Sequence, residues 1–129
     1  MLPACEAYGV GVIPWSPLDG GLLGGIIKKT EKGQRRLTGR AKDALKANRK
    51  AIKAYEDLCD EIGEEPAHVG LAWLLHQDAV TAPIIGPRTM EQLDGTLRAL
   101  EVALADDALA RLDELFPGPG GPAPEAYAW

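Results

Sequence analysis

One short stretch constrains the fold of this chain more than any other: an apolar run that ends in an aromatic residue, a serine and a glycine-rich loop. Residues 9–14 are β-branched or small and are bounded by glycine and proline, which predicts a short strand buried on both faces. Trp15, Ser16 and several glycines follow directly. We expect this loop to present a flat ring, a hydroxyl and backbone N–H groups at a strand's carboxyl end, where α/β folds bind ligands.

A second apolar run, residues 80–85, predicts a second strand, which ends at Gly86 and Pro87. Apolar periodicity, with a stop at Gly63 and a proline opening at Pro66, predicts helices in the rest of the chain. These helices cover residues 2–8, 40–62, 66–75, 90–104 and 106–116. In the fourth helix we expect an inner stripe of Leu93, Leu97, Leu100 and Leu104. Residues 28–39 are polar and basic without a usable period, and we expect them to be mobile.

The turn after the second strand is also informative. Thr89 and Gln92 fit a capping box, so the helix is expected to begin at about Met90. The N–H groups and the dipole of a helix N-terminus favour a phosphate, and Arg88 adds a cation with a planar fork of donors. The sequence therefore predicts an anion site at this turn.

The length of 129 residues, with 46% hydrophobic residues, fits one domain. No run of about 18 apolar residues occurs, and the N-terminus lacks the features of a signal peptide, so we expect a cytoplasmic protein whose first helix begins part-way. Cys5 and Cys59 have no metal or redox spacing and are expected to be reduced, buried thiols. His68 and His76 lie eight residues apart rather than four, so no metal site is assigned.

The charges are strongly polarised along the chain. The net charge is −5, but residues 28–53 hold eleven of the fourteen basic residues against two acidic ones, a local charge of +9, which leaves −14 on the remainder. Because no aromatic residues are interleaved with these cations, we expect a solvated loop and helix face, and we do not expect nucleic acid as a partner. Binding of a polyanion through residues 28–53 stays open as an alternative.

Two strings of residues resemble a known family. GVGVIPWSPLDGGLLGG and LAWLLHQDAVTAPIIGPRTMEQL are similar to the seventh and eighth βα units of aldo-keto reductases, and LADDALARLDELF resembles the helix that follows them. The resemblance implies a partial (β/α)8 barrel: two parallel strands with four or five helices. Residues 1–116 would form the C-terminal part of the barrel, and residues 117–129 a Pro/Gly-rich tail.

The same resemblance implies a nicotinamide dinucleotide, NADPH, bound across the strand ends. Trp15 occupies the position that stacks on the nicotinamide ring in the family. Further cofactor contacts are implied along the pyrophosphate path for Ser16, Pro17, Leu18 and Gly20, and at the adenosine end for Gly86, Arg88 and Gln92, with Arg88 on the 2′-phosphate. Thr96 stands where the family commonly has an asparagine near the adenine, and Ile26 where it often has a lysine.

No residue of this chain matches the family's catalytic tyrosine, lysine, aspartate or histidine, so no catalytic residue is assigned. We therefore expect this chain to be the C-terminal, cofactor-binding portion of an NADPH-dependent oxidoreductase, without the catalytic half of that enzyme. The alternative is a non-catalytic dinucleotide-binding or self-assembling truncated barrel protein. Two strands cannot close a barrel and leave edges unpaired, so a homo-oligomer or a complementing barrel half is expected as partner.

Overall fold

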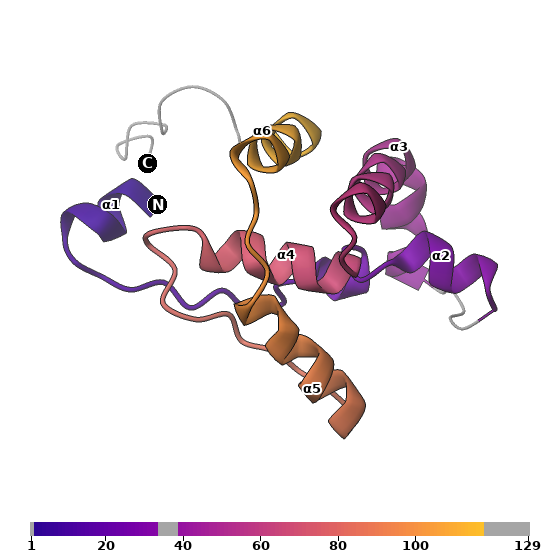
Figure 1. The fold of residues 1–129 in the computed structure, drawn as a ribbon, viewed down its shortest axis with the longest axis horizontal. Coiled ribbons are helices and arrows are strands. Elements are labelled where there is room, and N and C mark those ends of the chain that lie inside the picture. Colours follow the sequence, from indigo (N-terminus) through magenta and orange to yellow (C-terminus); the bar gives the residue numbers. More distant parts are fainter. Residues whose placement is uncertain (1, 34–38, 118–129) are drawn as a thin grey trace.

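The structure is a computed structural model, which describes residues 2–33 and 39–117. The described residues are mostly helical (Figure 1). The α-helices are α1 (Leu2–Ala7), α2 (Ile26–Glu31), α3 (Gly39–Ile62), α4 (Pro66–Leu75), α5 (Met90–Leu97) and α6 (Asp106–Leu115), and two 3-10 helices are η1 (Asp19–Gly21) and η2 (Arg98–Leu100). None of the helices in this part of the chain is long and apolar enough to cross a bilayer.

The long helix α3 joins the two clusters of the hydrophobic core. Its first half packs Leu45 and Ile52 against the start of α2, and its second half packs Tyr55, Leu58 and Cys59 against α4 and α6. This division follows the period expected from the sequence, which predicted the helix and its buried face correctly. In Figure 1, α4 runs through the middle of the molecule, with α3 and α6 on one side and α5 on the other.

The two expected strands are reduced to isolated bridges. Val12 pairs with Val80 and Trp15 with Ile84, both in the parallel direction, and no longer strand forms among the described residues. Three backbone hydrogen bonds of 2.8–2.9 Å join the two segments. Pro14 has no N–H to donate, and the register shifts by one residue between the bridges, so a continuous ladder cannot form. The two contacts therefore have the parallel direction expected for a partial barrel, but they do not form its strands.

The expectation that residues 9–14 are buried on both faces is wrong. Val10 is 55% exposed and Ile13 58% exposed, because no element among the described residues covers this segment. The inner stripe expected for the fourth helix also fails in part. The α-helix ends at Leu97, continues only as η2, and leaves Leu97 and Leu100 exposed, while Ala99 is buried.

Residues 28–39, which have no usable period and which we expect from the sequence to be mobile, include helical residues: Lys28 to Glu31 belong to α2, and Gly39 begins α3. The helix α2 is held by a residue distant in sequence. Glu56 is 2% exposed, and its carboxylate accepts hydrogen bonds from the N–H groups of Ile27 at 2.8 Å and Lys28 at 3.1 Å. A carboxylate at these positions satisfies two of the N–H groups that a helix start leaves without partners and also complements the helix dipole. Residues 34–38 lie outside the described residues.

The remaining expectations on helices and thiols are largely met. α1, α4 and α6 lie where the sequence predicted helices, and Pro66 opens α4 at its first position. Cys59 is a buried free thiol, whereas Cys5 is only half-buried. All of the Pro/Gly-rich tail except Pro117 lies outside the described residues.

Candidate functional site

The two motifs singled out in the sequence lie at the ends of adjacent segments. The N–H of Ile84 donates to the carbonyl oxygen of Pro14 at 2.9 Å, and Trp15 is bridged to Ile84. From there one segment enters the glycine-rich loop and the other runs through Gly86 to α5. The Trp15 side chain is 81% exposed, so its ring is open to a ligand.

A glycine permits the close approach of these segments. A Cβ at Gly11 would lie 2.2 Å from the Thr81 Oγ1 atom, a distance at which one of the two groups has to move. Hydrogen bonds from Val12 N to Ala79 O and from Thr81 N to Val12 O flank the contact. The absence of a side chain at Gly11 therefore helps to position the two segments of the site.

The glycine-rich loop is tightly folded. Ser16 and Asp19 have φ values of +54° and +46°, the left-handed region that residues other than glycine adopt at a cost of roughly 1–2 kcal/mol each. The Ser16 Oγ accepts from the Gly20 N–H at 3.3 Å. The Leu18 side chain packs against Gly70 of α4, where an added Cβ would lie 3.3 Å from Leu18 Cδ2. The loop is thus anchored to the core by its own leucine.

The N–H groups of residues 19–24 are all donated to acceptors inside this loop. The expectation that the loop presents its N–H groups outward is wrong for these six residues. A tight turn satisfies its donors internally when the chain folds back within four residues. The N–H groups of these six residues are therefore not available to a ligand, whereas the Ser16 hydroxyl and a surface of small residues are.

The second motif forms the Thr89 half of the expected capping box, but the Gln92 side chain reaches the N–H of the residue before the cap rather than that of Thr89. The Thr89 Oγ1 accepts from the Gln92 N–H at 3.2 Å, and the Gln92 Oε1 accepts from the Arg88 N–H at 2.8 Å. α5 begins at Met90, as predicted. Because Gln92 uses its carbonyl oxygen in the cap, its amide NH₂ remains to donate to a ligand.

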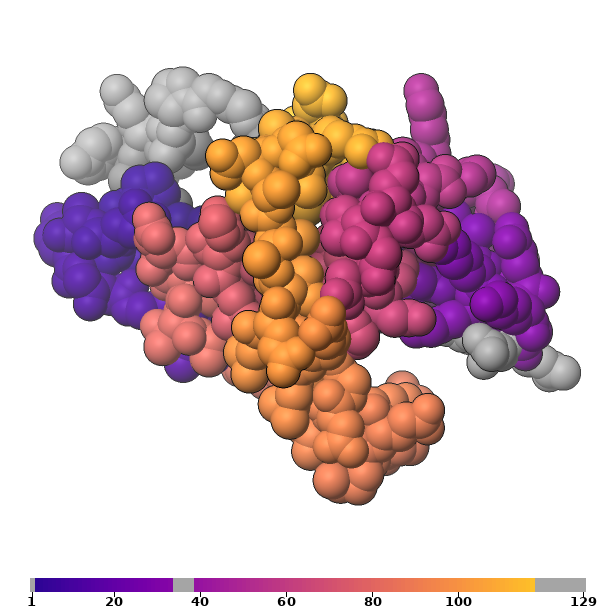
Figure 2. Space-filling model, in the orientation of Figure 1, coloured from indigo at the N-terminus to yellow at the C-terminus, as the bar shows by residue number. Residues whose placement is uncertain are grey.

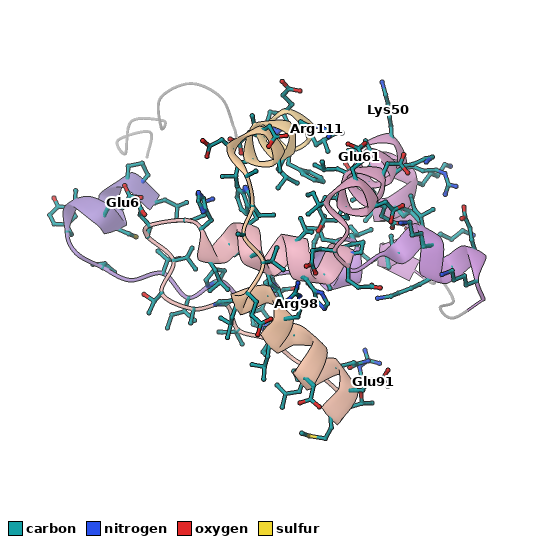
Figure 3. The ribbon with its side chains drawn as sticks, in the orientation of Figure 1. Glu6, Lys50, Glu61, Glu91, Arg98 and Arg111 are labelled. Carbon is teal, nitrogen blue, oxygen red and sulfur yellow. The ribbon has the colours of Figure 1, made fainter. Side chains whose placement is uncertain are left out.

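Further along α5, the Thr96 hydroxyl donates to the Gln92 carbonyl oxygen at 2.6 Å, so toward a ligand it can only accept. The Arg88 guanidinium has no carboxylate within 4 Å in the part of the chain that the structure describes. Glu91, labelled at the outer end of α5 in Figure 3, is the acidic residue of the first turn. Its carboxylate would repel another anion bound at this turn. α5 forms a lobe that projects from the body (Figure 2).

The comparisons with known proteins bear on this arrangement. The model of the Aldo/keto reductase family matches residues 1–116. The chain belongs to the aldo/keto reductase family. An uncharacterized oxidoreductase of Bacillus subtilis, YrpG, is 50% identical over 129 residues, which is all of this chain and 39% of the relative. A putative aryl-alcohol dehydrogenase of Schizosaccharomyces pombe is 37% identical over 119 residues, covering 90% of this chain and 33% of the relative.

A third relative, norsolorinic acid reductase of Emericella nidulans, is 29% identical over 117 residues, covering 91% of this chain and 29% of the relative. The chain thus spans between 29% and 39% of the length of these three relatives. The family resemblance seen in the two sequence strings is confirmed.

The lysines near the loop differ from what the aldo/keto reductase resemblance implies. Ile26 stands where a lysine is frequent, and its side chain is completely buried. Lys29 donates to the Gly24 carbonyl oxygen at 2.6 Å, and Lys28 is ion-paired with Asp60. This ion pair raises the pKa of the Lys28 ammonium, chiefly through the hydrogen bond to Asp60. Both nearby lysines are therefore engaged within the protein.

The buried titratable groups of this aldo/keto reductase chain have structural roles. The Tyr55 hydroxyl donates to the Pro66 carbonyl oxygen, and burial raises its pKa well above the usual value. Burial also raises the pKa of the Cys59 thiol to about 12. Sequence analysis missed Glu56, although a glutamate between Ile52 and Cys59, on the apolar face of the predicted helix, was a detectable sign of a buried carboxylate.

Proposed function

We propose that this chain forms the dinucleotide-binding part of an NADPH-dependent oxidoreductase of the aldo/keto reductase family. The observation that carries the proposal is the parallel bridge between Trp15 and Ile84, because it brings the exposed indole beside the segment that leads to Arg88 and α5. Family membership and the oxidoreductase names of the relatives support the same function.

The proposed nicotinamide end is at Trp15. The exposed ring offers a flat face for stacking on the nicotinamide. Ser16, Pro17, Leu18 and Gly20 would line the pyrophosphate path. Because the N–H groups of residues 19–24 are already donated, the Ser16 hydroxyl would make a polar contact, and the small residues would let the phosphates approach.

The proposed adenosine end is at the start of α5. Arg88 would bind the 2′-phosphate that distinguishes NADPH from NADH, assisted by the N–H groups at the start of the helix. Gly86 leaves space, since a Cβ there would meet nothing within 4 Å. Gln92 and Thr96 would contact the adenosine through the amide NH₂ and the hydroxyl oxygen respectively.

When bound, the cofactor would supply a hydride to a carbonyl carbon of the substrate. The chain's own residues would bind and orient the cofactor. Tyr55 is not placed to protonate the resulting alkoxide, because it is buried and its hydroxyl is hydrogen-bonded to Pro66. General acid catalysis typically contributes about 10²–10⁴-fold to the rate. We therefore expect binding of NADPH by these residues with slow carbonyl reduction.

Calorimetric titration of the chain with NADPH and with NADH tests this proposal. Arg88→Ala should weaken NADPH about 10–100-fold, as expected for a lost charge-assisted contact worth about 1.5–3 kcal/mol, and change NADH by less than about threefold. Trp15→Ala should weaken both cofactors alike. The matched control is Arg49→Ala, an exposed arginine of α3 without an ion pair in the described residues. Equal effects of Arg88→Ala on the two cofactors would contradict the proposal.

A second proposed property is association with another copy of the chain or with a complementing barrel half. The N–H and the C=O of Val12 are both hydrogen-bonded to the second segment, at Ala79 and Thr81. The backbone groups of Gly11 and Ile13 therefore point to the opposite side. Exposed β-branched residues beside an unpaired edge favour pairing with another strand. Light scattering at micromolar concentration measures the mass, and a monomeric mass would count against self-association.

A further inference from the structure

The charges of α3 are arranged against the dipole of the helix. The basic residues lie between Arg40 and Lys53, with Asp43 among them, whereas Asp57, Asp60 and Glu61 lie in the last turns. The N-terminus of a helix carries partial positive charge and favours anions in the first turn, and the C-terminus favours cations in the last turn. This distribution destabilises the isolated helix at both ends.

The charged side chains at the two ends of α3 differ in whether ion pairs neutralise them. Asp57 pairs with Lys53 at 2.7 Å, Glu61 pairs with Arg111 at 2.5 Å, and Asp60 pairs with Lys28. Figure 3 shows Glu61 and Arg111 close together between α3 and α6. The exposed acidic residues at this end are therefore neutralised within the molecule.

The basic end is not compensated in this way. Within residues 2–33 and 39–117, no carboxylate oxygen lies within 4 Å of the charged groups of Lys42, Lys46, Arg49 or Lys50. All four residues are exposed, and Lys50 extends away from the body in Figure 3. Neighbours such as Lys42 and Lys46 are four residues apart, a spacing at which like charges repel on a helix.

These four residues, together with Lys53, which is paired with Asp57, form one row, which we call the α3 basic row: Lys42, Lys46, Arg49, Lys50 and Lys53. Spacings of three and four residues put them on one helix face, and at 1.5 Å per residue the row is about 16 Å long. The apolar side of α3 is buried in the core, so the row lies on the outer side.

Against the sequence-based expectation that nucleic acid is not a partner, we propose that the α3 basic row is a docking surface for the phosphate backbone of double-stranded nucleic acid, bound without regard to base sequence. A duplex strand carries one phosphate per 3.4 Å of axis, so a row of about 16 Å faces four or five phosphates. No exposed aromatic residue accompanies the row on α3, which removes the stacking platform that single strands need. The row contains none of the residues of the proposed cofactor site.

The charge distribution favours a duplex over an anionic membrane. Residues outside 28–53 carry a charge of −14, and a flat anionic surface would bring many of them within the Debye length of about 8 Å. The phosphate backbone of a duplex can contact the α3 basic row without approaching most of the acidic residues on the rest of the chain. The helix also has no apolar face free for insertion, because Leu45, Ile52 and Cys59 are buried.

Fluorescence anisotropy with a labelled random-sequence DNA duplex tests the proposal on the full chain. The logarithm of the affinity should fall with the logarithm of the salt concentration with a slope of about −4, so a fourfold rise in salt weakens binding about 250-fold. Lys46→Ala/Lys50→Ala should reduce the slope by about 2. The control Ala103→Glu/Ala110→Glu makes the same change in net charge at exposed positions away from the row, and should keep the slope.

Removal of like-charge repulsion should leave the melting temperature of Lys46→Ala/Lys50→Ala equal or higher, so loss of binding cannot come from unfolding. Lys42→Gln/Arg49→Gln gives a second pair from the row and should lower the slope equally. The proposal is overturned by absence of binding at low salt or by an equal loss in the control. Tighter binding to phosphatidylserine vesicles than to the duplex, lost in the same variants, would also overturn it.

Discussion

Replacement of Glu56 by alanine should lower the free energy of unfolding more than the loss of one of the protein's surface ion pairs does. The buried carboxylate holds the N–H groups of Ile27 and Lys28, and truncation leaves both donors without this acceptor, the first in a buried site and the second in a partly buried one. At about 1–3 kcal/mol for each unsatisfied group, the expected loss is about 2–6 kcal/mol, a large part of the 5–15 kcal/mol typical of a domain. Glu56→Gln keeps one carbonyl oxygen and should lose about 1–3 kcal/mol.

Urea unfolding followed by circular dichroism measures these losses, and amide hydrogen exchange locates them. Exchange should accelerate first at Ile27 and Lys28, because the cap of α2 is removed. Glu61→Ala, an exposed glutamate of the same helix paired with Arg111, is the matched control and should cost at most about 1 kcal/mol. A loss for Glu56→Ala no larger than that of the control, with unchanged exchange in α2, would refute the reasoning.

Three further outcomes are expected. Thr89→Ala should cost about 1 kcal/mol and speed amide exchange in the first turn of α5, and Thr89→Ser, which keeps the cap oxygen, should restore the exchange rate. The hydrogen bond from Arg98 lowers the pKa of Glu64 below its ordinary value of 4.5, so this pair stabilises the fold above that pH. The stabilisation is lost as the pH falls through the lowered pKa; acid unfolding curves of Glu64→Gln should lack this contribution, and an unchanged curve would contradict it. With a thiol reagent at pH 8, Cys5 should react in the folded chain and Cys59 only after unfolding, whereas two fast thiols would show that Cys59 is accessible.

Local patterns were sufficient for the helices and for one part of the candidate site. The period of Leu45, Ile52 and Cys59 predicted α3 and its buried face, and Thr89 with Gln92 predicted the start of α5. These features depend on contacts within a few residues, where spacing alone sets which side chains meet.

Burial and pairing between distant segments were predicted less well. Val10 and Ile13 read as buried because their residue types are those of inner strands, but burial also requires a second element to cover them. α2 was missed because its sequence is basic and short, and the group that caps it, Glu56, is 28 or 29 residues away.

The sequence by itself determined the helices with strong periods, the Thr89 cap of α5, the family, and the concentration of basic charge between residues 28 and 53. Only the tertiary structure decided that Trp15 lies beside Ile84, that the glycine-rich loop satisfies its own N–H groups, and which cations of α3 have acidic partners. The physical reason is range. Spacing along the chain fixes contacts between near neighbours, whereas the pairing of segments and the compensation of charges depend on which distant residues the fold brings together.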